Sequence, residues 1–84
     1  MKITENDLKK NNYFERGKVK AVTVEKNKDT NLWEMKLSIE NIWKNSNILT
    51  SLELKRGGIR QFRTLDAAAK FLEKLGGKEF EVRL

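Results

Sequence analysis

The sequence predicts an α+β domain in which one helix covers one face of an antiparallel sheet of about four to five strands. Three observations carry this prediction. In residues 32–40, LWEMKLSIE, apolar and polar side chains alternate from Trp33 to Glu40, as they do in a half-buried strand. After Thr64, apolar residues recur at helical spacing. No proline occurs in the 84 residues, so none interrupts a strand or a helix.

We expect a single domain over residues 1–84, because a chain of this length supports one small core. Residues 1–15 form an N-terminal arm or short helix, and residues 17–63 form two β-hairpins. Residues 64–76 form the helix and residues 79–84 a terminal strand. At the N-terminus, Thr4 resembles a helix cap followed by acidic residues. A frayed tail is the alternative.

The first hairpin is predicted from two alternating runs that flank the turn residues 27–31. Val22 and Val24 share one face of the first run. In the second run, the inward residues are Trp33, Met35, Leu37 and Ile39. We expect Val24 to lie opposite Trp33, and Val22 opposite Met35.

The second hairpin is predicted to turn at Gly57 and Gly58, with Leu52 and Leu54 facing inward. A two-residue glycine loop would place a glutamate opposite a core phenylalanine. A three-residue loop over residues 56–58 instead aligns Leu52 with Phe62 and Leu54 with Arg60. We therefore expect the longer loop, which makes the glycines a turn rather than a phosphate-binding loop.

The helix after this hairpin is predicted to begin at the cap Thr64 and to end at Gly76. Its apolar stripe consists of Leu65, Ala68, Phe71, Leu72 and Leu75. The terminal strand follows as KEFEVRL. That strand either joins the same sheet or pairs with a second subunit.

The strongest functional candidate is a group of cations in and around the second hairpin. They would contact phosphates on a duplex or, alternatively, be only solvated. We expect Arg56 at the tip and Arg60 at the rim of the core, with its stem over Leu54 and its head in water. The open sheet face would mix basic, hydrogen-bonding and acidic side chains. They are Thr23, Lys36, Ser38, Lys55, Gln61 and Arg63, together with Glu34, Glu40 and Glu53. The candidate nucleic-acid-binding residues are Lys55, Arg56, Arg60, Gln61, Arg63 and Lys36, with Trp43 and Tyr13 as candidate stacking platforms.

Composition narrows the function further. The chain has no cysteine and no histidine, which removes zinc-finger, iron–sulfur and thiol-nucleophile sites and the usual general base. We therefore expect no enzymatic activity, no metal, no cofactor and no small-molecule substrate. No apolar run is long enough for a membrane span, and the first residues lack the apolar core of a signal peptide, so we expect a cytoplasmic protein.

The segment RGGIRQFRTLDAAAKFLEKLG resembles the ending of small accessory proteins encoded on plasmids and other mobile elements. Its strand, cap and helix are also similar to the end of three-stranded integrase DNA-binding domains, which lack the extra C-terminal strand. The resemblance covers about a third of the chain, and it implies DNA handling on a mobile element.

Eighteen lysines and arginines against twelve acidic residues leave a net charge of +6, which is common in domains that bind nucleic acid. We therefore expect a small nucleic-acid-binding module that binds DNA in preference to RNA. A chain with so thin a core would gain stability as a homodimer. The alternative function is a protein-interaction or oligomerisation module that assembles through an exposed strand edge.

Overall fold

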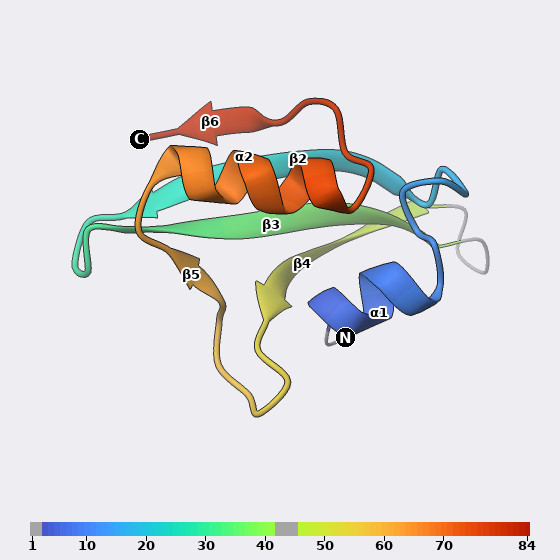
Figure 1. Cartoon of the computed structure of the whole chain (residues 1–84), viewed down its shortest axis with the longest axis horizontal. Coiled ribbons are helices and arrows are strands. Elements are labelled where there is room, and N and C mark those ends of the chain that lie inside the picture. Colours follow the sequence, from blue (N-terminus) through green and yellow to red (C-terminus); the bar gives the residue numbers. More distant parts are fainter. Residues whose placement is uncertain (1–2, 42–45) are drawn as a thin grey trace.

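A computed structural model describes residues 3–41 and 46–84 of the chain. In this part the chain forms a mixed six-stranded sheet and two helices, both on one face of the sheet (Figure 1). The elements are β1 (Ile3–Thr4), α1 (Glu5–Lys10), β2 (Val19–Asn27), β3 (Leu32–Asn41), β4 (Ser46–Glu53), β5 (Gln61–Phe62), α2 (Leu65–Lys74) and β6 (Glu81–Arg83). Neither helix in these ranges is long and apolar enough to cross a membrane.

The sequence predicted an antiparallel sheet of about four to five strands, and this prediction is wrong in part: the sheet has six strands and is mixed. Its strand order is β1-β4-β3-β2-β6, and β5 also pairs with β3. The pairs of β3 are antiparallel, whereas β1 pairs with β4 and β6 pairs with β2 in parallel. The terminal strand therefore joins the same sheet, which was one of the two expected outcomes. It is parallel because α2 carries the chain back across the sheet between β5 and β6.

The first hairpin forms, but its predicted register is wrong by two residues. Val24 lies opposite Met35, and Val22 lies opposite Leu37. A four-residue turn, 28–31, sets the observed register: Asn27 lies opposite Leu32, and Asn31, with a left-handed φ of 61°, donates its N–H to the Asn27 carbonyl at 2.7 Å. A shift of two residues keeps every side chain on its expected face. The residues predicted to face the core from these strands therefore still face it, with Val22, Val24, Met35, Leu37 and Ile39 buried.

The second hairpin is a two-stranded ladder only near its turn, where Glu53 lies opposite Ile59 and the Arg60 N–H donates to the Leu52 carbonyl at 2.9 Å. β5 pairs with β3 through Phe62 opposite Trp33, whereas β4 pairs with β3 farther along, beginning at Ser51 opposite Lys36. Thus β4 and β5 lie end to end on one edge of β3. Leu52 is buried as predicted but lies opposite Ile3 of β1 rather than opposite Phe62.

We call the connection between β4 and β5 the tip loop (residues 54–60). It begins with a hydrogen bond from the Leu54 N–H to the Gly58 carbonyl at 2.9 Å, and a single bridge joins Glu53 to Ile59. The bond between Leu54 and Gly58 closes a turn of three residues, 55–57, which has the predicted length but lies one position earlier in the chain, so Leu52 lies across from Arg60 rather than Phe62. Leu54, which was expected to face the core, is 46% exposed.

The core lies between the sheet and the two helices. In α2 the Thr64 hydroxyl accepts from the Ala67 N–H at 3.0 Å, which caps the helix as the sequence predicts. Helix α1 also forms, with a reciprocal capping box between Thr4 and Asp7. The buried apolar residues are Ile3, Leu8, Val22, Val24, Met35, Leu37, Ile39, Leu52, Phe62, Ala68, Phe71 and Leu72.

Candidate nucleic-acid interface

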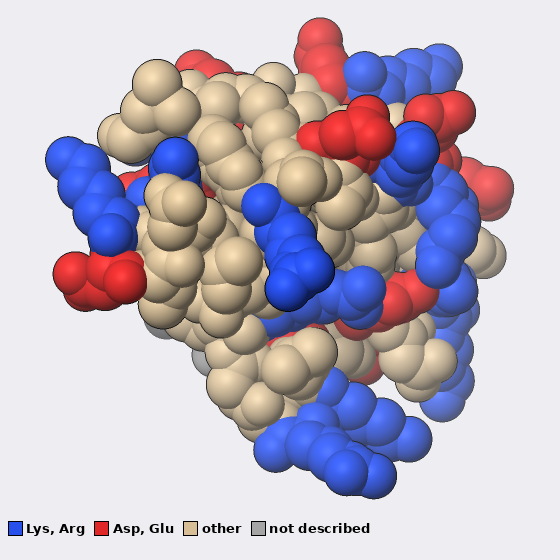
Figure 2. Space-filling view, turned by 60° about the vertical axis from the view of Figure 1, so that its left-hand side comes forward, with Lys and Arg blue, Asp and Glu red and all other residues tan. Residues whose placement is uncertain are grey.

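The tip loop carries two exposed cations away from the sheet. Lys55 and Arg56 are exposed in this loop, which forms the lowest part of the molecule in Figure 1. Figure 2 shows a cluster of basic side chains at the same end of the molecule. The next two residues, Gly57 and Gly58, have φ angles of 100° and 87°. Only glycine adopts such angles without strain, so these residues shape the tip.

Arg60 lies on the helix side of the sheet, where it is partly buried. Its guanidinium carbon is 4.6 Å from the centre of the Phe71 ring and 5.3 Å from that of Phe62. Its Nη1 donates to Glu5 Oε1 at 2.8 Å. The predicted position, with the stem over Leu54 and the head in water, is therefore wrong: ring faces and a carboxylate attract the guanidinium to the helix side of the sheet.

The open face of the sheet carries carboxylates beside its cations and hydrogen-bonding side chains, and these carboxylates bind two of the predicted site residues. Lys36 Nζ lies 3.0 Å from Glu25 Oε2, and the Gln61 amide donates to Glu34 Oε2 at 3.1 Å. The register explains these contacts. Glu25 and Glu34 lie opposite each other on β2 and β3, and the next pair on the same face is Thr23 and Lys36. Lys36 and Gln61 are therefore engaged by carboxylates of the same face.

The remaining predicted residues have different surroundings. Arg63 is exposed and forms no ion pair with the residues that the structure describes. Tyr13 is half-buried against the core and is a poor stacking platform. Trp43, the other predicted platform, lies outside the described residues.

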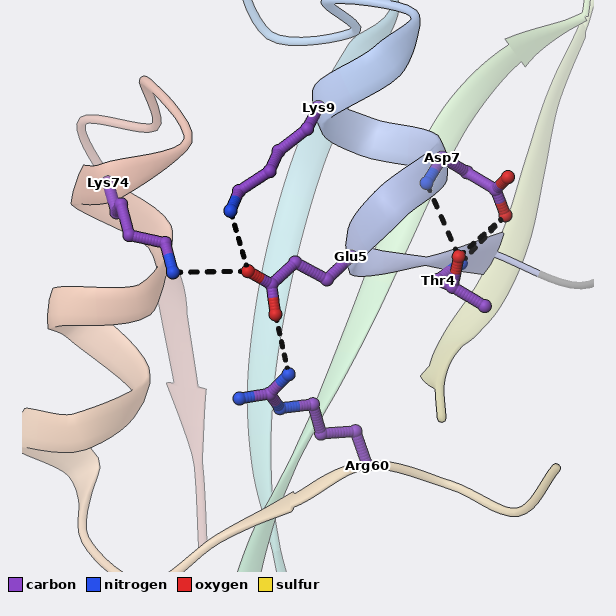
Figure 3. A network of polar contacts seen from close by, with 6 residues as sticks. All are labelled: Thr4, Glu5, Asp7, Lys9, Arg60 and Lys74. Carbon is purple, nitrogen blue, oxygen red and sulfur yellow. Dashed lines mark hydrogen bonds and ion pairs between the residues drawn. The ribbon is translucent and has the colours of Figure 1, made fainter. Parts of the chain in front are cut away.

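Three cations from three elements surround the carboxylate of Glu5, the first residue of α1 (Figure 3). Lys9 Nζ and Lys74 Nζ each lie 3.1 Å from Oε2, and Arg60 binds the other oxygen. Partial burial acts to raise the pKa of Glu5, but the hydrogen bonds from Lys74, Lys9 and Arg60 outweigh it and lower the pKa to about 2. Glu5 is therefore ionised at every physiological pH.

Sequence reasoning did not find this cluster. The spacing of Glu5 and Lys9 by four residues on one helix was a usable signal for that pair. Arg60 and Lys74 are distant in sequence, and only the packing of α1 beside α2 and the tip loop brings them to the carboxylate.

A groove of about 340 Å³ runs beside this cluster and reaches the tip loop. The cations that line it are Lys9, Lys55 and Arg60, and the carboxylates are Glu5 and Glu53. Cations of the tip loop and of α1 therefore border the same groove. An extended anion that lay in this groove would be close to all three cations.

Comparisons with protein-family models, with curated proteins and with solved structures find no match for this chain. The resemblance of residues 56–76 to mobile-element proteins therefore stays a prediction. The residues of the chain itself carry the functional argument that follows.

Proposed function

We propose that the protein is a non-enzymatic nucleic-acid-binding module that contacts the phosphate backbone of DNA through the tip loop. One observation carries the proposal. Residues 54–63 contain the cations Lys55, Arg56, Arg60 and Arg63 and no acidic residue. Phosphate contacts of this kind supply most of the sequence-independent affinity of DNA-binding proteins.

The surroundings of these cations support the tip loop over the open sheet face as the binding surface. On the open face, Lys36 is paired with Glu25, and a carboxylate so close would compete with any phosphate. In the tip loop Arg56 is exposed and forms no ion pair with the residues that the structure describes. Duplex DNA is favoured over single strands, because Tyr13, the predicted platform that the structure describes, is half-buried.

Salt titrations of binding to duplex DNA, single-stranded DNA and RNA test the proposal. The double variant Lys55→Gln/Arg56→Gln should weaken duplex binding. The plot of log affinity against log salt should become shallower by about 1.8, since each lost phosphate contact contributes about 0.9. The matched control is Arg16→Gln/Lys28→Gln, which removes one arginine and one lysine from exposed turns elsewhere.

The control should keep the slope of the unaltered protein. If the two double variants lose equal affinity for duplex DNA, net charge rather than the tip loop drives binding. Absence of binding at 50 mM salt, about the lowest concentration at which such affinities are compared, would contradict the proposed function itself.

A second candidate function is self-association through a strand edge, as in a homodimer. On the edge of β2 that faces away from β3, β6 pairs with Thr23–Glu25, and the described residues provide no strand partner for residues 19–22 on that edge. This stretch of β2 borders a hollow of about 460 Å³ that also contacts Phe80. A free backbone edge is where a second chain adds most readily.

Sedimentation at several protein concentrations tests this second candidate. A dimer that Ala21→Pro converts to a folded monomer would support pairing at this edge, since proline removes a backbone donor. A monomer at all concentrations would contradict it.

A further inference from the structure

The cluster around Glu5 contains more positive charge than one carboxylate neutralises. Lys9, Arg60 and Lys74 contribute three positive charges and Glu5 one negative charge, which leaves a local excess of two. The two lysine side chains are 50% and 57% exposed. An ammonium group has three donors and a guanidinium has five, so donors remain for a second anion.

Arg60 is held in place for such a ligand. The rings of Phe62 and Phe71 lie against its guanidinium, and one Nη is bound to Glu5. Figure 3 shows the other Nη directed away from Glu5. An arginine that is already ordered loses less conformational entropy when it binds a phosphate.

The groove described above connects this cluster with the tip loop, because Lys9, Lys55 and Arg60 all line it. A nucleic-acid backbone that contacts the tip loop would reach the cluster along the groove. A single bound phosphate ion would not need this continuity, whereas a chain of phosphates uses it.

We propose that Lys9, Arg60 and Lys74 form a phosphate subsite for a nucleic-acid backbone, and that Glu5 is a built-in counter-ion that lowers the affinity of this subsite. The inference rests on the proposed function and extends it to the helix side of the molecule. In the free protein Glu5 keeps the three cations together. In the complex, phosphate oxygens accept from the donors that Glu5 leaves unused, and the charge of Glu5 opposes their binding.

The first test is Glu5→Gln, which keeps the size of the side chain and removes its charge. Binding of duplex DNA should tighten about fivefold at 50 mM salt, since one unit charge about 4 Å away in a water-like dielectric changes affinity by that factor. The matched control is Asp66→Asn, which also removes a carboxylate partner of an α2 lysine. The control should change affinity less than twofold, about the shift that one distant surface charge causes.

The second test does not require Glu5 to be altered. Lys74→Gln should weaken binding of duplex DNA by about fivefold, while Lys70→Gln should weaken it less than twofold. Both lysines lie on α2, and each forms an ion pair with one carboxylate. Each variant removes one positive charge, so the two variants have equal net charge. If Glu5→Gln does not fold, as judged by circular dichroism, this pair of variants decides the question.

The outcomes separate the inference from the proposed function. If the unaltered protein binds DNA through the tip loop but Lys74→Gln behaves like Lys70→Gln, the subsite is wrong and the proposed function stands. If no nucleic acid binds at all, both are wrong. Binding to anionic phosphatidylserine vesicles that depends on Lys74, with no binding to DNA, would assign the phosphate to a lipid and overturn the inference.

Discussion

Arg60 Nη1 lies 2.8 Å from Glu5 Oε1, although the two residues are 55 positions apart in the chain. This contact joins the tip loop to α1, and Lys74 joins α2 to the same carboxylate. One side chain therefore ties together three elements of the helix side. The stability of this arrangement and the charge of the groove depend on the same carboxylate.

The first prediction concerns the pH dependence of stability. The pKa of Glu5 falls from 4.5 to about 2 on folding, so its ion pairs stabilise the protein above pH 4.5. That contribution is lost as the pH falls from 4.5 to 2. Because Lys9 and Lys74 are exposed and screened by solvent, we expect about 1–2 kcal/mol at pH 7.

Urea unfolding of the unaltered protein and of Glu5→Gln measures this contribution when it is repeated at neutral pH, at pH 4.5 and at about pH 2, which spans the titration of Glu5. The difference in unfolding free energy should shrink toward zero at the acid end. A difference that stays constant with pH would mean that the Glu5 charge has no role in stability.

The second prediction is that Arg60 stabilises the fold, whereas Arg56 does not. Arg60→Ala removes the contacts with Phe62 and Phe71 and the bond to Glu5, and should cost about 1–3 kcal/mol of unfolding free energy. Arg56→Ala in the exposed tip should stay within about 0.5 kcal/mol. Urea denaturation measures both, and equal losses would contradict the placement of Arg60 on the rings.

The third prediction compares two leucines two residues apart. Leu52 is fully buried, so Leu52→Ala should cost about 2–5 kcal/mol. Leu54 is 46% exposed at the start of the tip loop, and Leu54→Ala should cost less than about 1 kcal/mol. A regular hairpin with the predicted register would bury both side chains, so similar thermal-unfolding losses would favour that hairpin over the end-to-end arrangement of β4 and β5.

The fourth prediction concerns Gly77, which packs against α2. A Cβ at this position would clash with Leu72 Cγ and lie 2.7 Å from Leu72 Cδ1, closer than side-chain atoms approach. Gly77→Ala should therefore destabilise the protein by about 1–3 kcal/mol. In a double-mutant cycle, Leu72→Ala should remove most of this penalty, because the clashing atoms are then absent. Additive losses would show that the penalty has another origin.

Local patterns in the sequence determined the elements and their inward faces. The alternation at Met35, Leu37 and Ile39 reports a half-buried strand, and that alternation tolerates the two-residue register error. The cap at Thr64 and the apolar stripe predicted α2, because both signals lie within one helix. The cations of the tip loop were likewise visible in the sequence.

Only the tertiary structure decided how these elements meet. Past Ser51, residues 58–60 take over the edge of β4 that had paired with β3, while β1 pairs with the opposite edge, and this arrangement places β4 and β5 end to end along β3. It also brings Arg60 to Glu5 and Lys74, and it sets Lys36 beside Glu25. Backbone pairing and ion pairs between distant residues depend on the whole sheet, whereas alternation and capping depend only on near neighbours in the chain.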